Sequence, residues 1–281
     1  MLKKQDGAIM VSSPTAVSTV YGPVPSWRVG QSLGIDLIRD NSVCSFNCVY
    51  CQLGYIQDIT NQRREFVSTA TVLDDFQQSK WHEADIITYS GNGEPTLATN
   101  LGEVAKGIRA ITDIPQLCLT NGTTLGIPEV IQDLQLIDRV YVKLDAATET
   151  VFQRVNRPAD GISLQKIVDD AVKFRQVYNG FLGVQCMFLP LNTKEAEALT
   201  ELIQRIQPDE VQLNTPTRPY PKEWHYSTRG GHSKELRQYE GAPLKTISLQ
   251  EAERIEALLA EKTGLKILSV YQQSTASAPS A

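Results

Sequence analysis

The chain has 281 residues, of which 41% are hydrophobic and 21% are charged. These values are typical of globular proteins and exclude a disordered or fibrous chain, and the length suits one large domain or two small ones. A net charge of −5 gives no general attraction to nucleic acid or to anionic membranes. No apolar stretch approaches the roughly 18 residues of a membrane-spanning helix, so we expect a cytoplasmic protein whose thiols stay reduced.

Short β-branched segments alternate with longer amphipathic segments along the chain. Their periodicity predicts strands at residues 33–38, 85–89, 116–120, 140–144, 183–188 and 210–214. Helical spacing predicts helices at residues 101–111, 128–136, 162–178 and 194–206, each between two of these strands. A capping box, Ser248 to Glu251, predicts another helix at 249–262, and a last strand follows at 265–270. The alternation predicts an α/β fold with a parallel sheet.

The two ends of the chain are rich in Ser, Thr and Ala. We therefore expect a mobile N-terminal segment at residues 1–20 and a disordered tail at 272–281. Between them, residues 21–215 are predicted to form the barrel core, and residues 216–271 a C-terminal extension that caps it.

Polar or turn-forming residues follow most of the predicted strands. In parallel α/β barrels the carboxyl ends of the strands meet on one rim, where ligands bind. The segments on this predicted rim are the cysteine-bearing loop after the first strand and residues 90–95, 120–122, 143–145 and 214–216. The sequence therefore predicts one composite site built by several loops.

Three of the five cysteines, Cys44, Cys48 and Cys51, lie within eight residues. Thiolates bind iron–sulfur clusters or zinc, and both kinds of site usually take four protein ligands. Cys118 and Cys186 lie inside predicted strands, where free cysteines are commonly buried as small hydrophobic residues. The pattern thus predicts a metal site with three thiolates and one position left for a substrate or cofactor.

The spacing C-x3-C-x2-C, with Tyr50 directly before the last cysteine, resembles the signature of radical S-adenosylmethionine (SAM) enzymes. The resemblance implies a partial (βα)6, TIM-like barrel with a C-terminal helix-strand extension. It also implies that Cys44, Cys48 and Cys51 bind three irons of a [4Fe-4S] cluster, while SAM chelates the fourth iron. A flavodoxin- or ferredoxin-like protein would then donate the electron.

Other residues extend the resemblance along the predicted rim. Gly91, Gly93 and Glu94 look like the glycine-rich motif that contacts the methionyl ammonium of SAM in this family. By the same resemblance, Asn121 and Asp145 would face the adenosyl group. Further predicted pocket residues are Gln185 and Asn214.

Within the superfamily, the chain is similar to a group of Fe–S oxidoreductases related to wyosine-type tRNA-modifying enzymes. The matching segments are residues 21–28, 32–34, 51–54, 90–96, 143–146 and 213–216. Archaeal members that make 4-demethylwyosine carry a second cluster on additional N-terminal cysteines. This chain has no cysteine before Cys44, so we expect no second cluster and do not transfer the tRNA-modifying activity.

Cationic residues near the rim are candidates for substrate contact and catalysis. Lys143 shares one face of the fourth predicted strand with Asp145, either as an ion pair or as a pocket wall. Arg28, Arg157 and Arg218 each have a proline nearby, and a guanidinium group suits a carboxylate or phosphate. We therefore expect an anionic substrate, either a small molecule or RNA.

Three other functions remain open from the residues alone. The cysteines could hold zinc in a structural module, with a histidine as the fourth ligand. Cys48 and Cys51 could form a dithiol redox pair. The chain could also bind RNA without catalysis, since Arg and Lys alternate with aromatic residues at 218–237.

Overall fold

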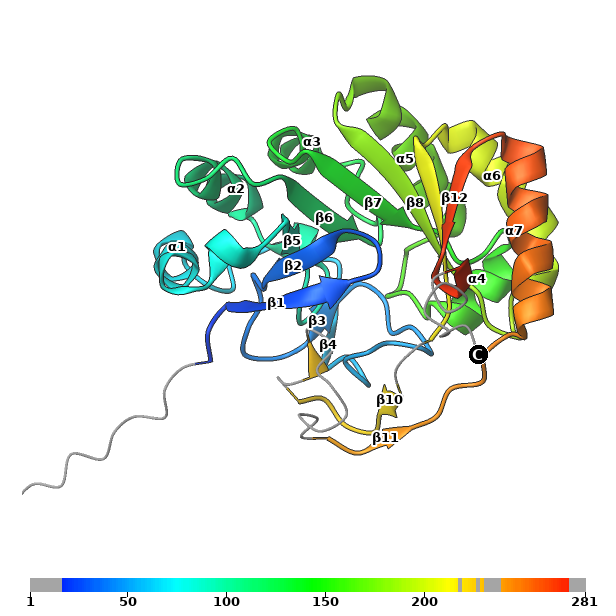
Figure 1. Ribbon diagram of the computed structural model, residues 1–281, viewed down its shortest axis with the longest axis horizontal. Coiled ribbons are helices and arrows are strands. Elements are labelled where there is room, and N and C mark those ends of the chain that lie inside the picture. The colour runs from blue at the N-terminus through cyan, green and yellow to red at the C-terminus, as the bar shows by residue number, and fades with distance from the viewer. Residues whose placement is uncertain (1–16, 217–218, 226–227, 230–238, 273–281) are drawn as a thin grey trace, which may run out of the picture.

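The computed structural model describes residues 17–216, 219–225, 228–229 and 239–272. Its centre is one sheet in the order β1-β2-β5-β6-β7-β8-β9-β12, which curls into a half-barrel with helices along its outer face (Figure 1). All neighbouring strands pair in parallel except β1 and β2. The predicted α/β fold of partial (βα)6 barrel type is confirmed. The strands are β1 (Val20–Ser26), β2 (Gly30–Ile35), β5 (Ile86–Tyr89), β6 (Gln116–Thr120), β7 (Arg139–Lys143), β8 (Phe181–Met187), β9 (Glu210–Asn214) and β12 (Lys266–Ser269).

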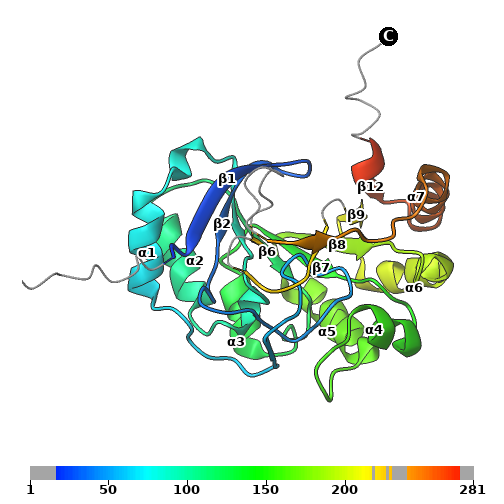
Figure 2. The same cartoon turned by 90° about the horizontal axis from the view of Figure 1, so that it is seen from below.

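The helices connect successive strands and cover the convex face of the sheet (Figure 2). No described helix has the length and apolar composition that a bilayer crossing requires. The α-helices are α1 (Thr69–Gln78), α2 (Leu101–Arg109), α3 (Pro128–Leu134), α4 (Glu149–Val155), α5 (Leu164–Val177), α6 (Ala196–Ile206) and α7 (Leu249–Thr263). Short 3-10 turns are η1 (Trp81–Glu83), η2 (Pro95–Leu97) and η3 (Thr193–Glu195).

Short strands gather on one side of the sheet, where the carboxyl-end loops lie (Figure 1). They are β3 (Val43–Cys44) with β4 (Asp58–Ile59), and β10 (Tyr220–Pro221) with β11 (Gly241–Ala242). The first pair lies in the cysteine-bearing loop. The second pair lies in the segment between β9 and α7, so residues far apart in sequence meet on this side.

The sequence pattern did not predict strand β1. Pro23 and Pro25 lie inside it, and a proline cannot donate a hydrogen bond to a neighbouring strand. The structure accommodates both residues because β1 is the edge strand and pairs only with β2. Helices α1 and α4 were also missed.

Alternation along the strands separates two apolar clusters. On β5, Ile87 and Tyr89 belong to the main core shared with the helices. Ile86 belongs instead to a small cluster with Leu117 and Tyr141 on the concave face. The helices therefore close the convex face, whereas the concave face keeps room for a ligand beneath the carboxyl-end loops.

The concave face depends on a glycine for its packing. A methyl group at Gly183 would overlap the ring of Tyr141, whose hydroxyl donates to Glu210 Oε1 at 2.8 Å. We expect Gly183→Ala to lower the free energy of unfolding by about 1–3 kcal/mol, the usual cost of overpacking. Urea unfolding measures this loss. In a Tyr141→Ala background the substitution should cost less than half as much, and an equal cost in both backgrounds would contradict the explanation.

Candidate functional site

The cysteine-bearing loop is held by backbone hydrogen bonds to the end of α4. The N–H of Val49 donates to Val155 O at 2.9 Å, and the N–H of Asn47 donates to Asn156 O at 3.0 Å. Three residues after Asn156, the N–H of Ala159 donates to Ser45 O at 2.8 Å. These bonds fix the backbone that carries the three clustered thiols, those of Cys44, Cys48 and Cys51.

The three thiols lie in a largely desolvated environment. Burial raises the pKa of Cys48 to about 12 and the pKa of Cys51 to about 11, and it also raises the pKa of Cys44. The side-chain N–H groups of Asn121 and Asn156 each donate to a sulfur, Asn121 to Cys44 and Asn156 to Cys48, both at 3.5 Å. Thiolates in such surroundings need a cationic partner, which a bound metal provides.

The three thiols can be compared with the geometry of a single-metal site. In the described part of the chain, no three His, Cys, Asp or Glu side chains are arranged to hold a single metal ion. A structural zinc ion requires such convergence. In an iron–sulfur cluster each thiolate binds a different iron, so the sulfurs can stand apart.

The glycine-rich loop after β5 lies directly against the cysteine-bearing loop. Gly93 forms a bridge with Val43, and a side chain at Gly93 would clash with the Val43 carbonyl oxygen. At Gly91, which has a φ of +140°, an added Cβ would lie 2.6 Å from Cγ of Asp36. Only glycine allows this close approach, and both glycines line the cavity described below.

Glu94 completes this loop, but its carboxylate is directed into the protein. Oε1 accepts from the hydroxyls of Thr96 and Thr120, both at 2.7 Å, and Oε2 accepts from the N–H of Asn121 at 2.7 Å. Burial raises the pKa of Glu94, and these hydrogen bonds oppose that rise. These bonds fix the carboxylate of Glu94 within the protein, and its contact with a SAM ammonium stays a prediction.

Asp145 has a similar position at the end of β7. Its Oδ2 accepts from the Tyr50 hydroxyl and from Asn156 Nδ2, the latter at 2.7 Å. Its Oδ1 accepts from the N–H of Met187 at 2.7 Å and lies 3.5 Å from Lys143 Nζ. The predicted Lys143–Asp145 contact is therefore an ion pair. Asp145 links the cysteine-bearing loop to β7 and β8, and it does not line the cavity.

A cavity of about 560 Å³ opens between the loops and the concave face of the sheet. Of the predicted site residues, Cys44, Cys51, Gly91, Gly93 and Asn214 line it. The other described members of the predicted set do not line it, namely Cys48, Tyr50, Glu94, Asn121, Lys143, Asp145, Arg157 and Gln185. Five of the predicted residues therefore share one cavity wall.

The predicted arginines are dispersed. Arg157 is exposed beside the cysteine-bearing loop, where its carbonyl oxygen accepts from the N–H of Asn47 at 3.1 Å. It has a left-handed φ of +47°, which is uncommon for a bulky residue. Arg218 lies outside the described residues. Arg28, in the turn between β1 and β2, lines the cavity beside Trp27.

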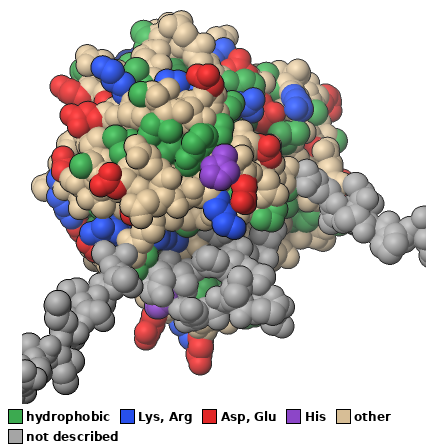
Figure 3. Space-filling model, turned by 60° about the vertical axis from the view of Figure 1, so that its left-hand side comes forward, with side chains coloured by type: hydrophobic (Ala, Val, Ile, Leu, Met, Phe, Trp, Pro, Cys, Tyr) green, Lys and Arg blue, Asp and Glu red, His purple; other side chains and the backbone are tan. Residues whose placement is uncertain are grey.

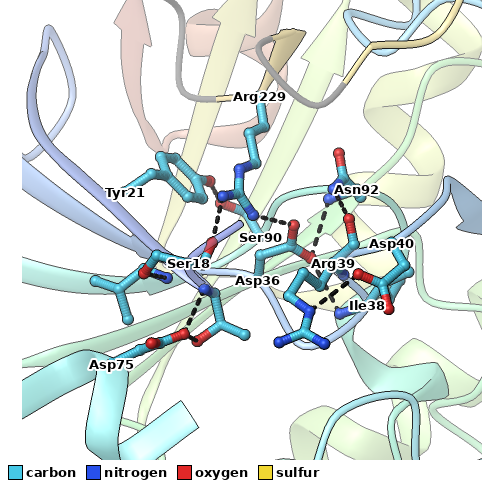
Figure 4. Close-up of polar contacts among 12 residues, drawn as sticks. Ser18, Tyr21, Asp36, Ile38, Arg39, Asp40, Asp75, Ser90, Asn92 and Arg229 are labelled. Carbon is cyan, nitrogen blue, oxygen red and sulfur yellow. Dashed lines mark hydrogen bonds and ion pairs between the residues drawn. The ribbon is translucent and has the colours of Figure 1, made fainter. Parts of the chain in front are cut away.

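Sequence reasoning missed a buried ion pair on the cavity wall. Arg229 Nη1 lies 2.6 Å from Asp36 Oδ2, and the two side chains are 5% and 1% exposed. Figure 4 shows Arg229 extended toward Asp36 between Tyr21 and Asn92. The two partners are separated by 193 residues, so no local pattern could indicate their contact.

Comparison with known proteins identifies the family. The sequence profile of the radical SAM superfamily matches residues 39–203, a span that contains the three cysteines and the glycine-rich loop. The chain belongs to the radical SAM superfamily. Radical SAM proteins are enzymes that use a [4Fe-4S] cluster and SAM.

Relatives are found among both sequences and structures. The UPF0026 protein slr1464 of Synechocystis sp. is 47% identical over 220 residues, 78% of this chain and 83% of that protein. A UPF0026 protein of Methanocaldococcus jannaschii is 33% identical over 210 residues, 72% of this chain and 65% of that protein. A structure of TYW1 with a lysine-pyruvate adduct bound matches with a TM-score of 0.58 at 14% identity, over 85% of this chain and 77% of that one. At that identity the likeness shows the radical SAM fold.

The residues present fit the cofactors of a radical SAM enzyme. Three thiols from one loop supply soft ligands for irons. Next to Cys51, Gln52 lines the cavity and has a buried Oε1 without a hydrogen-bond partner among the described residues. A buried acceptor of this kind gains a bond when a ligand brings a donor, and SAM carries an ammonium and ribose hydroxyls.

Iron loading tests the role of the clustered cysteines. We expect Cys44→Ala, Cys48→Ala and Cys51→Ala each to lose most of the iron and sulfide that the wild type takes up in anaerobic reconstitution, since each removes one cluster ligand. Cys118→Ala is the matched control, because that thiol is fully buried in β6. Iron and sulfide analysis measures the result, and equal iron in all four variants would contradict the assignment.

The structural role of Glu94 can be tested in the metal-free protein. In Glu94→Gln an NH2 group replaces one oxygen, so it must face a donor such as the N–H of Asn121. We expect a loss of about 1–3 kcal/mol in the free energy of unfolding, the cost of a buried donor without an acceptor. Chemical denaturation measures it, with the exposed Glu103→Gln as control. A loss no larger than in the control would show that the carboxylate is not needed in this position.

Proposed function

We propose that this chain binds a [4Fe-4S] cluster through Cys44, Cys48 and Cys51 and cleaves SAM reductively to abstract hydrogen from a substrate. One observation carries the proposal. Cys44 and Cys51, from a loop with three thiols and no fourth cysteine nearby, share a cavity wall with the glycine-rich loop. Bound together, the cluster and SAM supply a 5′-deoxyadenosyl radical, which is the reactive species of this chemistry.

The residues of the chain would hold the cofactors and keep water away. Gly91 and Gly93 allow the backbone to approach a ligand closely. Gln52 offers its buried acceptor next to Cys51. The concave wall below adds the hydroxyls of Ser32 and Thr88, which hydrogen bond to each other at 2.8 Å. Enclosure of this kind protects a reactive intermediate from side reactions.

The charge of the cavity lining supports an anionic substrate. Among the described lining residues there are two guanidinium groups, those of Arg28 and Arg229, and no carboxylate. Arg229 is already paired with Asp36, so the expectation of an anionic substrate depends on Arg28. Arg28 lies over the ring of Trp27, 5.5 Å from its centroid, which gives a flat cationic surface next to an aromatic one. Such a surface suits a carboxylate or phosphate.

The surface charge favours a small molecule over RNA. The cavity of about 560 Å³ is of the size usual for small-molecule sites, about 300–1,000 Å³, and SAM would take up part of it. Figure 3 shows acidic and basic side chains interspersed on the face of the molecule in that view, whereas RNA-binding proteins carry basic surfaces.

A cytoplasmic flavodoxin- or ferredoxin-like protein would supply the electron.

SAM cleavage tests the proposal directly. We expect the reconstituted wild type to form 5′-deoxyadenosine when it is incubated anaerobically with SAM and dithionite, measured by chromatography and mass spectrometry. Cys51→Ala should form none above background, because it lacks a cluster ligand. No 5′-deoxyadenosine from iron-loaded wild type would overturn the proposal. Stoichiometric zinc without iron uptake would favour the zinc-binding module instead.

A further inference from the structure

The carboxylate of Asp36 joins the two loops that line the cavity. Asp36 follows β2 and is 1% exposed. Its Oδ1 accepts from the N–H groups of Ile38 and Arg39 at 3.0 and 3.1 Å, at the start of the cysteine-bearing loop. The same oxygen accepts from the N–H of Asn92 at 3.3 Å, in the glycine-rich loop. One oxygen therefore fixes the beginning of one loop relative to the other.

A second set of hydrogen bonds links the cysteine-bearing loop to the glycine-rich loop. Asn92 Nδ2 donates to Arg39 O at 2.8 Å, and the N–H of Val43 donates to Asn92 O at 2.9 Å. Gly91 packs directly on Asp36, since an added Cβ would lie 2.6 Å from Cγ of that residue. The position of the Asp36 carboxylate thus sets where Gly91 and Asn92 can lie.

The other oxygen of Asp36 is held by a distant segment. Arg229, between β10 and β11, pairs with Asp36 Oδ2 at 2.6 Å. Its second guanidinium nitrogen donates to Ser18 O, directly before β1, and its Cζ lies 5.2 Å from the ring centroid of Tyr21. The Tyr21 hydroxyl is in turn 2.8 Å from Ser90 Oγ, just before the glycine-rich loop (Figure 4). Arg229 therefore supports the glycine-rich loop in two ways, through Asp36 and through Tyr21.

Because Asp36 and Arg229 are both buried, the loss of Arg229 would strongly affect Asp36. A buried carboxylate without its cationic partner is strongly unfavourable, so loss of Arg229 would force Asp36 to move or to recruit water. Asp36 cannot move without disturbing the N–H groups of Ile38, Arg39 and Asn92. Further along the loop, the backbone N–H groups of Asn47 and Val49, on either side of Cys48, donate to the end of α4. Displacement of Asp36 would thus act first on Gly91 and Asn92, which contact it directly, whereas Cys48 and Cys51 lie near the separate bonds to α4.

We propose that Arg229 is a positioning residue for SAM, which acts through Asp36 to hold the glycine-rich loop at its working distance from the cysteine-bearing loop. The inference rests on the proposed function, since it concerns how the same cavity binds SAM. It makes SAM affinity, and not iron loading, the property that depends on Arg229.

The experiment measures iron content and SAM affinity separately. Reconstituted variants are analysed for iron, and SAM binding is measured by anaerobic equilibrium dialysis without reductant, so that no turnover occurs. We expect Arg229→Gln to keep wild-type iron content and to raise the Kd for SAM at least tenfold. The matched control is Arg205→Gln, which breaks an exposed 2.7 Å pair with Asp169 on the convex face and should leave the Kd within twofold of wild type.

Two further variants separate positioning from general destabilisation. Arg229→Lys keeps the charge but offers a single ammonium in place of the fork that reaches both Asp36 and Ser18, so its Kd should fall between those of wild type and Arg229→Gln. In an Asp36→Asn background, Arg229→Gln should change the Kd less than twofold, because the partner through which it acts is gone. If Arg229→Gln does not fold, Arg229→Lys decides.

Three outcomes would overturn the inference. They are a Kd for Arg229→Gln within twofold of wild type, a parallel loss of iron and SAM binding, and additive effects of Arg229→Gln and Asp36→Asn. Failure of the iron-loaded wild type to bind SAM would overturn the proposed function itself, and this inference with it.

Discussion

The contact between Gly93 and Val43 is the constraint on which the candidate site depends. It brings the glycine-rich loop against the cysteine-bearing loop, and a side chain at Gly93 would force them apart. Backbone bonds on both sides, from Val43 N–H to Asn92 O and from Glu94 N–H to Val43 O, give the contact a single register. Both loops follow the carboxyl ends of neighbouring parallel strands, β2 and β5. The sheet therefore places them side by side at the same edge.

Buried carboxylates secure the loops around this contact. Asp36, Glu94 and Asp145 are each almost fully buried, and each accepts hydrogen bonds from more than one segment of the chain. A buried carboxylate is stable only when its oxygens are satisfied, so each of the three specifies one arrangement of the residues around it. The oxygens of Glu94 and Asp145 accept hydrogen bonds from protein groups, and their predicted contacts with SAM stay predictions.

The sequence predicted the repeating part of the fold well. Strands β5 to β9 and helices α2, α3 and α5 to α7 follow the periodicity of their apolar residues, because each buries a regular face. Strand β1 escaped prediction because Pro23 and Pro25 are compatible only with an edge strand, and edge position is a property of the finished sheet. For the site, spacing identified Cys44, Cys51, Gly91 and Gly93, which line the cavity together.

By itself, the sequence determined most of the strands and helices in their order, the trio of thiols and membership of the radical SAM superfamily, since these depend on local residue spacing. Only the tertiary structure decided which of the predicted side chains line the cavity and which form hydrogen bonds within the protein. It also decided that Arg229 lies against Asp36. The physical reason is that burial and charge pairing depend on contacts between segments far apart in the chain, and the pattern within any one segment does not encode them.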